Sequence, residues 1–481
     1  MENFRINNDK IYEKFLAHLK MPDNKRILLS GRFGIGKTYF IQGFFENHGE
    51  YEPTFITPVN YQVANNEDIF GLIKYDILLE FLSKGIIDTE GVQVDEFLSL
   101  QFYIQNRSSD LILDLLSLFS KLGKANQLIK DLNNFIQDFK KYSKTINESQ
   151  LDIVSRYAEL VEDTEGSIYE CDFLTKLIFE LQDRIREKGK KSILVIDDID
   201  RIEPEHIFRI LNIFSSHYTI DISEEDNKFN FDQVILICDI DNIRKIFHSK
   251  YGQEVDFSGY IDKFYSKSCF HFNNTSSILK SLDSIFPPLK NNKFKDSIVN
   301  VTKYFLTDFI KANSVNLRDL QNIPSIANQL QGNKRFQITE DFSFSESNIP
   351  LIKALFTLRE ILGNDDQKVI SCFNNCQQKI GESSIIKKFY FVKNLVPFIN
   401  INQTVFKIDT PQTIEIKDLG IKIQFKIVST HDFELDQQYE VELIKSYNSS
   451  SQDKKENLKV DEFYFILRTV YKNIINISPV E

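Results

Sequence analysis

Several residue types and patterns are scarce or absent in this chain of 481 residues, and each absence narrows its possible class. The chain has no tryptophan, two methionines and five scattered cysteines. An odd number of dispersed cysteines is typical of reduced thiols rather than of a disulfide scaffold. We find no run approaching the roughly 18 apolar residues of a membrane span, and no apolar signal segment follows the N-terminus. We therefore expect a cytoplasmic protein without a membrane partner.

The charge balance also limits the partners that can be expected. The sequence has 58 Lys and Arg against 69 Asp and Glu, a formal net charge of −11. A globally acidic chain is a poor electrostatic match for nucleic acid, although a basic channel assembled by several subunits is compatible with this total. Hydrophobic residues make up 42%, which is ordinary for a globular protein. The length allows two or three domains.

The most specific motif lies near the N-terminus, where residues 31–38 read Gly-Arg-Phe-Gly-Ile-Gly-Lys-Thr. They match G-x-x-x-x-G-K-[ST], a loop whose backbone N–H groups surround phosphates. An apolar stretch at residues 26–30 predicts a strand before the loop, and residues 39–45 predict a helix after it, which is the context that the motif requires. The predicted nucleotide-binding residues are Gly31, Arg32, Phe33, Gly34, Ile35, Gly36, Lys37, Thr38 and Tyr39.

A second motif supplies the acidic side chains that such a site needs. Residues 192–198 read Ser-Ile-Leu-Val-Ile-Asp-Asp, an aliphatic run typical of a central parallel strand that ends in carboxylates. Ligands bind at the carboxyl ends of the strands in α/β sheets. Asp197 and the Thr38 hydroxyl are predicted to hold Mg²⁺, Asp197 directly or through water. Lys37 is expected on the β- and γ-phosphates, and Asp198 is the candidate base that orients the attacking water.

A further apolar run at residues 231–238 predicts another buried strand, which ends at Asp239. A carboxylate at this position could sense the γ-phosphate. It could equally cap the helix that begins near Ile240. The sequence leaves both interpretations open.

The order of these elements predicts an α/β fold. We expect a P-loop NTPase domain with a central parallel sheet at residues 1–273, including a helical insertion at about 85–165 between the two motifs. Residues 274–390 predict a helical lid or sensor region. From Ile414 to Ile427, apolar and polar residues alternate around a turn and predict a hairpin, and a closing helix is expected at 461–475. Residues 391–481 are therefore expected to form a small α+β domain.

Two of these segments carry a family resemblance that covers about residues 1–335. Residues 197–201, Asp-Asp-Ile-Asp-Arg, resemble the D-D-x-D-R motif of the KAP family of P-loop NTPases, and residues 316–320 are similar to its N-x-R-D-L helix. The resemblance implies an ATPase of the additional-strand class, related to AAA+ and STAND proteins, in which Arg318 is a sensor arginine. Arg201 is a family residue that either pairs with Asp200 or acts across a subunit interface as an arginine finger.

The resemblance also sets the expected function. It implies ATP and Mg²⁺ as cofactors and an oligomeric ATP-hydrolysing switch or scaffold that regulates a protein partner on a separate chain, in bacterial antiviral defence. ATP is expected rather than GTP because we find no N-K-x-D guanine-reading motif. The alternatives are a nucleic-acid-stimulated AAA+-like motor or loader, and a scaffold that binds nucleotide without hydrolysing it. Membrane helices, which are common in the insertion of this family, are not found in this sequence.

Overall fold

The computed structural model divides into two compact units, Asp9–Asn273 and Met1–Asn8 with Asn274–Glu481. It describes residues 6–59, 69–84, 173–286 and 293–480, apart from short gaps at 216–226, 228, 325–333, 340–341, 347–348, 381–386, 402–403, 405, 431–437, 451–452, 456 and 478. The helical insertion predicted at about 85–165 lies outside the described residues.

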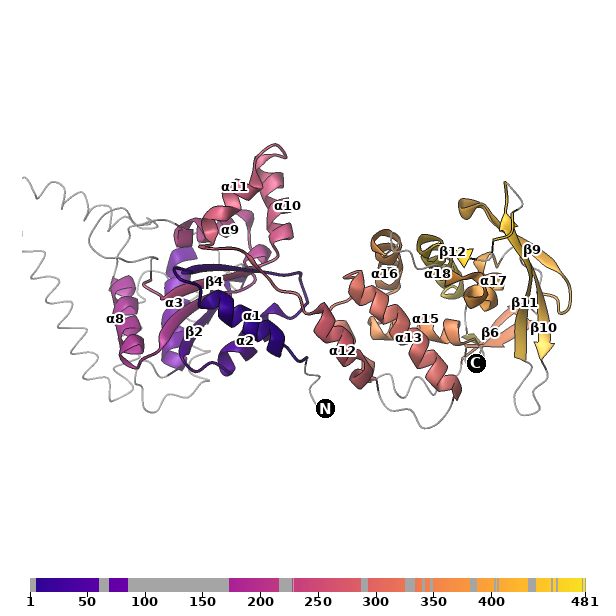
Figure 1. The fold of residues 1–481 in the computed structure, drawn as a ribbon, viewed down its shortest axis with the longest axis horizontal. Coiled ribbons are helices and arrows are strands. Elements are labelled where there is room, and N and C mark those ends of the chain that lie inside the picture. Colours follow the sequence, from indigo (N-terminus) through magenta and orange to yellow (C-terminus); the bar gives the residue numbers. More distant parts are fainter. Residues whose placement is uncertain are drawn as a thin grey trace, which may run out of the picture. The chain divides into compact units, whose positions relative to one another are not determined.

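The first unit is built on a parallel sheet of five strands in the order β2-β3-β4-β1-β5 (Figure 1). The glycine-rich loop follows β1. Its neighbour in the sheet, β4, pairs in parallel with both β1 and β3. The loop strand and the strand that ends at Asp197 are therefore separated by one additional strand. The strands are β1 (Arg26–Ser30), β2 (Tyr51–Ile56), β3 (Lys191–Ile196), β4 (Gln233–Cys238) and β5 (Phe270–His271).

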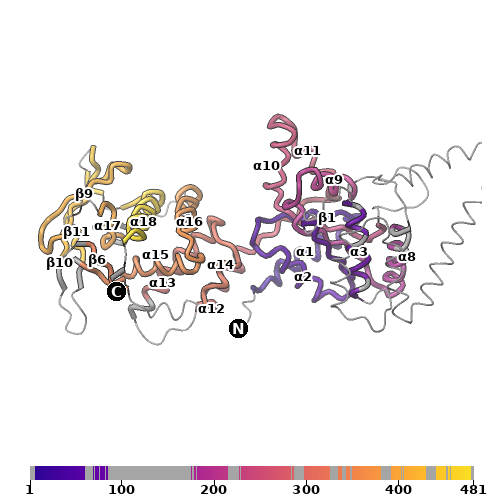
Figure 2. The backbone as a smooth tube through the Cα atoms, turned by 180° about the vertical axis from the view of Figure 1, so that it is seen from behind, coloured from indigo at the N-terminus to yellow at the C-terminus, as the bar shows by residue number. Residues whose placement is uncertain are grey.

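Helices cover both faces of this sheet because its strands are apolar on both sides. Successive side chains of β3 alternate: Ile193 and Val195 join the core on one face, and Leu194 and Ile196 join the core on the other. The first face is covered by α1 (Asp9–Leu19) and α2 (Lys37–Glu46). The second face is covered by α3 (Ile69–Ser83), α8 (Phe173–Glu187), α9 (Pro204–Ser215), α10 (Ile240–Tyr251) and α11 (Phe257–Ile261), the last three grouped together in Figures 1 and 2.

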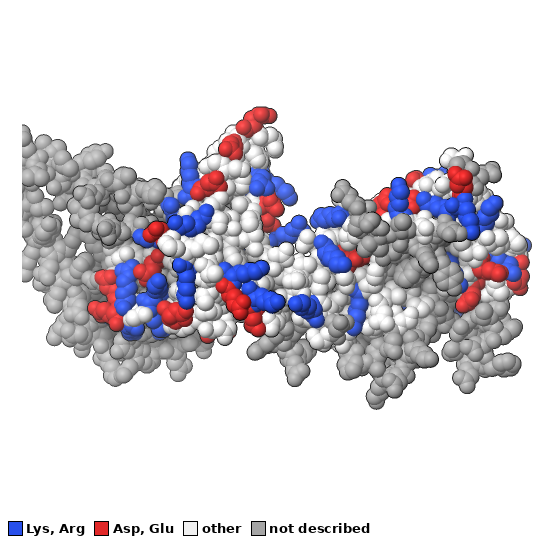
Figure 3. All heavy atoms as spheres, in the orientation of Figure 1, with Lys and Arg blue, Asp and Glu red and all other residues white. Residues whose placement is uncertain are grey.

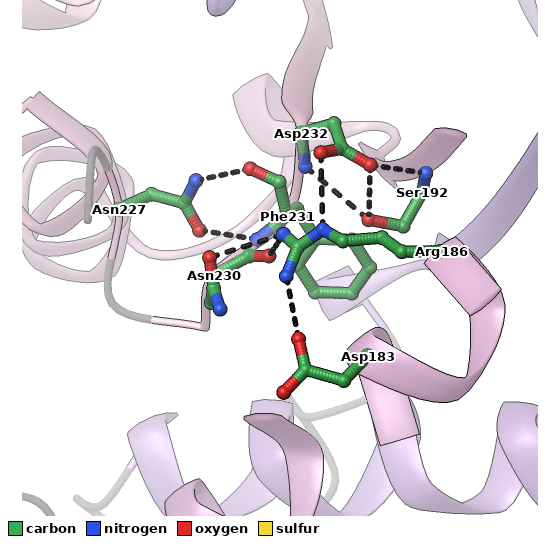
Figure 4. A network of polar contacts seen from close by, with 7 residues as sticks. All are labelled: Asp183, Arg186, Ser192, Asn227, Asn230, Phe231 and Asp232. Atoms are coloured by element: carbon green, nitrogen blue, oxygen red, sulfur yellow. Dashed lines mark hydrogen bonds and ion pairs between the residues drawn. The ribbon is translucent and has the colours of Figure 1, made fainter. Parts of the chain in front are cut away.

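A polar network holds the amino-terminal end of the sheet (Figure 4). Asp232, just before β4, accepts hydrogen bonds from the backbone N and the hydroxyl of Ser192 at 2.7 and 3.1 Å, and from Nε of Arg186 at 3.2 Å. Arg186 on α8 also contacts Asp183 and Asn230. The network joins α8, β3 and β4 at the end of the sheet opposite to the glycine-rich loop, so it supports the fold rather than the site.

The second unit combines helices with small antiparallel sheets around one core. A single hydrophobic cluster runs from Ile278 to Ile474, and it therefore spans the boundary predicted near residue 390. Its helices are α12 (Thr275–Ile285), α13 (Lys293–Lys311), α14 (Leu317–Leu320), α15 (Pro350–Ile361), α16 (Asp366–Lys379), α17 (Val396–Ile399) and α18 (Val460–Ile474). Among the helices that the structure describes in either unit, none combines the length and the apolar composition needed to cross a bilayer.

The predicted hairpin is confirmed as part of an antiparallel sheet with the order β11-β10-β9. Ile421 pairs with Ile416 and Ile423 with Ile414, so the apolar residues of neighbouring strands share the buried face. Gly420 in the connecting turn has a φ of 60°. These strands are β9 (Gln412–Ile416), β10 (Ile421–Thr430) and β11 (Gln438–Asn448); the other strands are β6 (Arg335–Thr339), β7 (Phe342–Ser345), β8 (Lys387–Lys388), β12 (Asn457–Leu458) and β13 (Pro479–Val480).

A buried ion pair makes the core of the second unit sensitive to substitution. The side chains of Lys353 on α15 and Glu346 are 7% and 3% exposed, and Glu346 also accepts from the backbone N of Lys334. Removing one member leaves an uncompensated buried charge, which typically costs about 3–5 kcal/mol. We expect Lys353→Met to lower the free energy of unfolding of this unit by about that amount in urea denaturation followed by circular dichroism. Lys353→Met combined with Glu346→Gln should recover part of the loss; a double variant as unstable as the single one would contradict this account.

Candidate nucleotide-binding site

The glycine-rich loop between β1 and α2 adopts the conformation that phosphate binding requires. Gly34 and Gly36 have φ values of 77° and 89°, a region that residues with a Cβ rarely adopt. Gly36 is the N-cap of α2, so the unpaired N–H groups and the positive dipole end of this helix face the concave side of the loop. Phe33 and Tyr39 are 55% and 48% exposed. Their contacts with a nucleotide stay a prediction.

The sheet holds the loop from both neighbouring strands. The N–H of Gly31 donates to the carbonyl of Cys238 on β4 at 3.0 Å, and the N–H of Phe272 after β5 donates to the carbonyl of Ser30 at 2.7 Å. A Cβ at Gly31 would lie 2.9 Å from Ile35 Cδ1 and 3.2 Å from the Phe272 carbonyl oxygen. Glycine is needed here because the backbone passes so close to its neighbours.

Lys37, the first residue of α2, is buried with its ammonium group inside the loop. Its Nζ donates to the carbonyl oxygens of Gly31 and Arg32 at 2.6 and 3.2 Å. The Arg32 side chain is exposed, and Ile35 packs against the core of the α1–α2 face. The ammonium group is therefore held against the backbone of the first two residues of the loop.

Thr38 and Asp197, which are 159 residues apart in sequence, meet at the carboxyl edge of the sheet. The Thr38 hydroxyl donates to Asp197 Oδ2 at 2.5 Å, and the Asp197 N–H donates to the carbonyl of Ile56 on β2 at 3.0 Å. Burial raises the pKa of Asp197 above its usual value, and the hydrogen bond from Thr38 opposes that rise. A buried carboxylate beside a hydroxyl is an oxygen donor set that suits Mg²⁺, so these residues fit the predicted metal.

The next turn separates its polar side chains between two environments. Asp198 has a φ of 54° and precedes the 3-10 turn η2 (Ile199–Arg201). Arg201 Nη1 donates to Asp198 Oδ2 at 2.8 Å, and both side chains are partly exposed. Asp200 is buried instead and accepts from Asn242 Nδ2 at 3.1 Å. The structure thus pairs Arg201 with Asp198 rather than with Asp200, because residues three apart share one side of the turn.

Asp239 caps α10, as one of its two sequence interpretations predicted. Its Oδ1 accepts from the N–H of Asp241 at 3.1 Å. The sensing of a γ-phosphate by Asp239 stays a prediction. Two neighbouring contacts were not predicted: Ser30 Oγ accepts from the N–H of Ile240 at 3.1 Å, and Asn242 holds Asp200. Ser30 directly precedes the loop, so its position in the sequence could have marked it as a residue of the site. No feature of the sequence indicates that Asn242 contacts Asp200.

Arg318 belongs to the second unit, where it is exposed on α14. Asn316 and Asp319 form a capping box at the start of this short helix, with Asp319 N–H donating to Asn316 Oδ1 at 3.0 Å. The buried Asp319 also accepts from Lys368 Nζ on α16 at 2.5 Å. These contacts fix α14 within its own unit. The predicted action of Arg318 on bound phosphates stays a prediction.

The sheet order, the loop and the paired Thr38 and Asp197 together define a P-loop NTPase of the additional-strand class. The model of the KAP family P-loop domain matches residues 8–331. The chain therefore belongs to the KAP family, and the match includes both acidic and glycine-rich motifs and extends through α14. No curated protein shows a significant sequence match to this chain.

Proposed function

We propose that this chain binds ATP together with Mg²⁺ and hydrolyses it. The observation that carries this proposal is the 2.5 Å contact between the Thr38 hydroxyl and Asp197 Oδ2 at the mouth of the loop. A scaffold that bound nucleotide only for stability would need the loop, Lys37 and the metal ligands, but it would not need Asp198, a carboxylate that can orient water. The intact set of Lys37, Thr38, Asp197 and Asp198 favours turnover.

The residues of the chain divide the work of hydrolysis between them. Lys37 would exchange the loop carbonyls for β- and γ-phosphate oxygens. Thr38 and Asp197 would hold Mg²⁺, which neutralises charge on the phosphates when bound. Asp198, next to Asp197 and partly exposed, is placed to accept a hydrogen bond from the attacking water and to orient it. Arg201 and Arg318 would stabilise charge at the γ-phosphate.

We further propose that hydrolysis drives an oligomeric switch that regulates a protein partner, and that the system serves antiviral defence in bacteria. The switch is supported by the additional-strand class, whose relatives in the AAA+ and STAND groups act as assemblies. The defence role is supported by family membership alone. The second unit would then dock the partner.

The direct test is Mg²⁺-dependent phosphate release from ATP, with GTP for comparison. ATP turnover without added polymer supports the switch, and absence of turnover sinks the enzyme proposal. Turnover that depends on DNA or RNA and falls steeply with salt would favour the nucleic-acid-stimulated motor or loader instead. On the face drawn in Figure 3, Lys and Arg of the first unit lie interspersed with Asp and Glu, which gives that alternative no support on this face.

Particle size tests the switch. We expect mass photometry or light scattering to show a shift to a defined oligomer when ATP and Mg²⁺ are added to the wild type. Asp198→Asn should hold that oligomer longer, because ATP stays bound without being cleaved. A monomer or dimer under every condition would count against an oligomeric switch and would favour a scaffold or an assembly that needs its partner.

A further inference from the structure

The guanidinium group of Arg201 lies between the candidate base and the tip of the glycine-rich loop. Its Nη1 is 2.8 Å from Asp198 Oδ2, and its Cζ is 5.2 Å from the ring centroid of Phe33. Phe33 is the third residue of the loop and is 55% exposed. A cation over an aromatic face within about 6 Å is attracted by the ring, so the two contacts act on one guanidinium group together.

Burial does not account for the position of Phe33. Phe33 is 55% exposed, so it contributes little to the core, and loops of this type hold phosphates through their backbone rather than through this side chain. The ring is instead connected to the loop at one end and to Arg201 at the other.

We propose that Phe33 is a positioning residue that acts in cis through Arg201. Its ring holds the guanidinium group against Asp198, and the ion pair then keeps the Asp198 carboxylate oriented toward the phosphates that the same loop surrounds. The ion pair by itself is weak, because its members are 44% and 23% exposed and solvent screens them. The stacking contact adds the geometric constraint that a flexible surface pair lacks. This inference rests on the proposed ATP hydrolysis.

The same unit contains a matched arrangement on residues outside the loop and the acidic motif. Arg244 on α10 donates to Asp241 Oδ1 at 2.7 Å, three residues apart as in the Asp198 pair, and its Cζ lies 5.2 Å from the ring of Phe257. The Arg244 side chain is 46% exposed, against 44% for Arg201. Arg244→Ala therefore removes a contact of the same kind from a pair that belongs neither to the loop nor to the acidic motif.

The experiment measures kcat and KM for ATP, and nucleotide affinity by titration with a fluorescent ATP analogue. Phe33→Ala and Phe33→Leu should lower kcat by about two- to fivefold, the scale of an exposed cation–π contact, with nucleotide affinity unchanged within about twofold. Phe33→Tyr, which keeps the aromatic face, should retain the wild-type kcat. In an Arg201→Ala background, Phe33→Ala should cause no further loss, because the ring then has no guanidinium group to hold.

Arg244→Ala should match the wild type, and thermal unfolding checks that every variant is folded.

The failure of this inference can be told apart from the failure of the proposed function. Wild-type protein without Mg²⁺-dependent ATP hydrolysis overturns both. If the wild type is active, the inference is overturned when Phe33→Ala leaves kcat unchanged, when Phe33→Leu is as active as Phe33→Tyr, or when the Phe33 and Arg201 losses multiply. It is also overturned if mixing Arg201→Ala subunits with inactive Lys37→Ala subunits raises hydrolysis above that of Arg201→Ala alone, since Arg201 would then act across a subunit interface.

Discussion

Lys37→Ala is expected to abolish nucleotide binding in a titration with a fluorescent ATP analogue. The ammonium group lies 2.6 Å from the Gly31 carbonyl oxygen, inside the loop that would surround the phosphates. Hydrogen bonds to charged groups contribute about 1.5–3 kcal/mol each. The loss of two hydrogen bonds from Lys37 to phosphate oxygens should weaken nucleotide binding by at least about 100-fold.

Two variants separate this effect from a loss of folding. Lys37→Met keeps the buried stem of the side chain and removes only the charge, so its thermal unfolding should stay close to that of the wild type while binding is lost. Lys190→Ala is the matched control, because Lys190 Nζ contacts Glu52 Oε2 at 2.7 Å at the amino-terminal end of the sheet. Normal ATP affinity in Lys37→Met would contradict the assignment of Lys37 to the phosphates.

Asp198→Asn is expected to keep nucleotide binding and to lose hydrolysis. A positioned base typically contributes about 10²- to 10⁴-fold to the rate, so single-turnover cleavage should slow by that order. Asparagine is a suitable probe because Asp198 has a φ of 54°, a left-handed conformation that asparagine tolerates. The substitution therefore removes the carboxylate charge without forcing the turn between Asp197 and Arg201 to change.

The control for this variant is Asp241→Asn. Asp241 is likewise paired with an arginine three residues later, Arg244, but it is distant from the loop in sequence. It should hydrolyse ATP at the wild-type rate. Asp197→Asn should behave differently from Asp198→Asn, since it removes a predicted Mg²⁺ ligand and should weaken the Mg²⁺-dependent part of binding. If Asp198→Asn loses binding as fully as Lys37→Met does, the role given to Asp198 is wrong.

Much of the P-loop unit could be predicted from short stretches of sequence. Gly34 and Gly36 are required by backbone angles that other residues rarely adopt, and the aliphatic run before Asp197 is required by a strand covered on both faces. The alternation from Ile414 to Ile427 likewise predicted the antiparallel strands of the second unit. In each case neighbouring residues in the chain carry the signal, because the physical constraint is local.

The contacts that join these stretches could not be read in the same way. The sequence left Asp239 between two roles, and the structure shows that it caps α10 through the N–H of Asp241. For Arg201 the sequence offered either a pair with Asp200 or a role across a subunit interface, and the structure pairs it with Asp198. The ring of Phe33 under Arg201 was not predicted either. Side-chain pairing depends on rotamers and on the turn between strand and helix, which composition and spacing do not specify.

The sequence by itself determined the class of site: a phosphate loop, a carboxylate at the end of a buried strand, and the local elements that carry both. Only the tertiary structure decided that β4 lies between β1 and β3, that Thr38 meets Asp197, and that one core runs through the second unit across residue 390. Local motifs follow from the backbone preferences of a few adjacent residues. Strand order and contacts between distant residues follow from which apolar faces bury one another, and that is settled only when the whole chain packs.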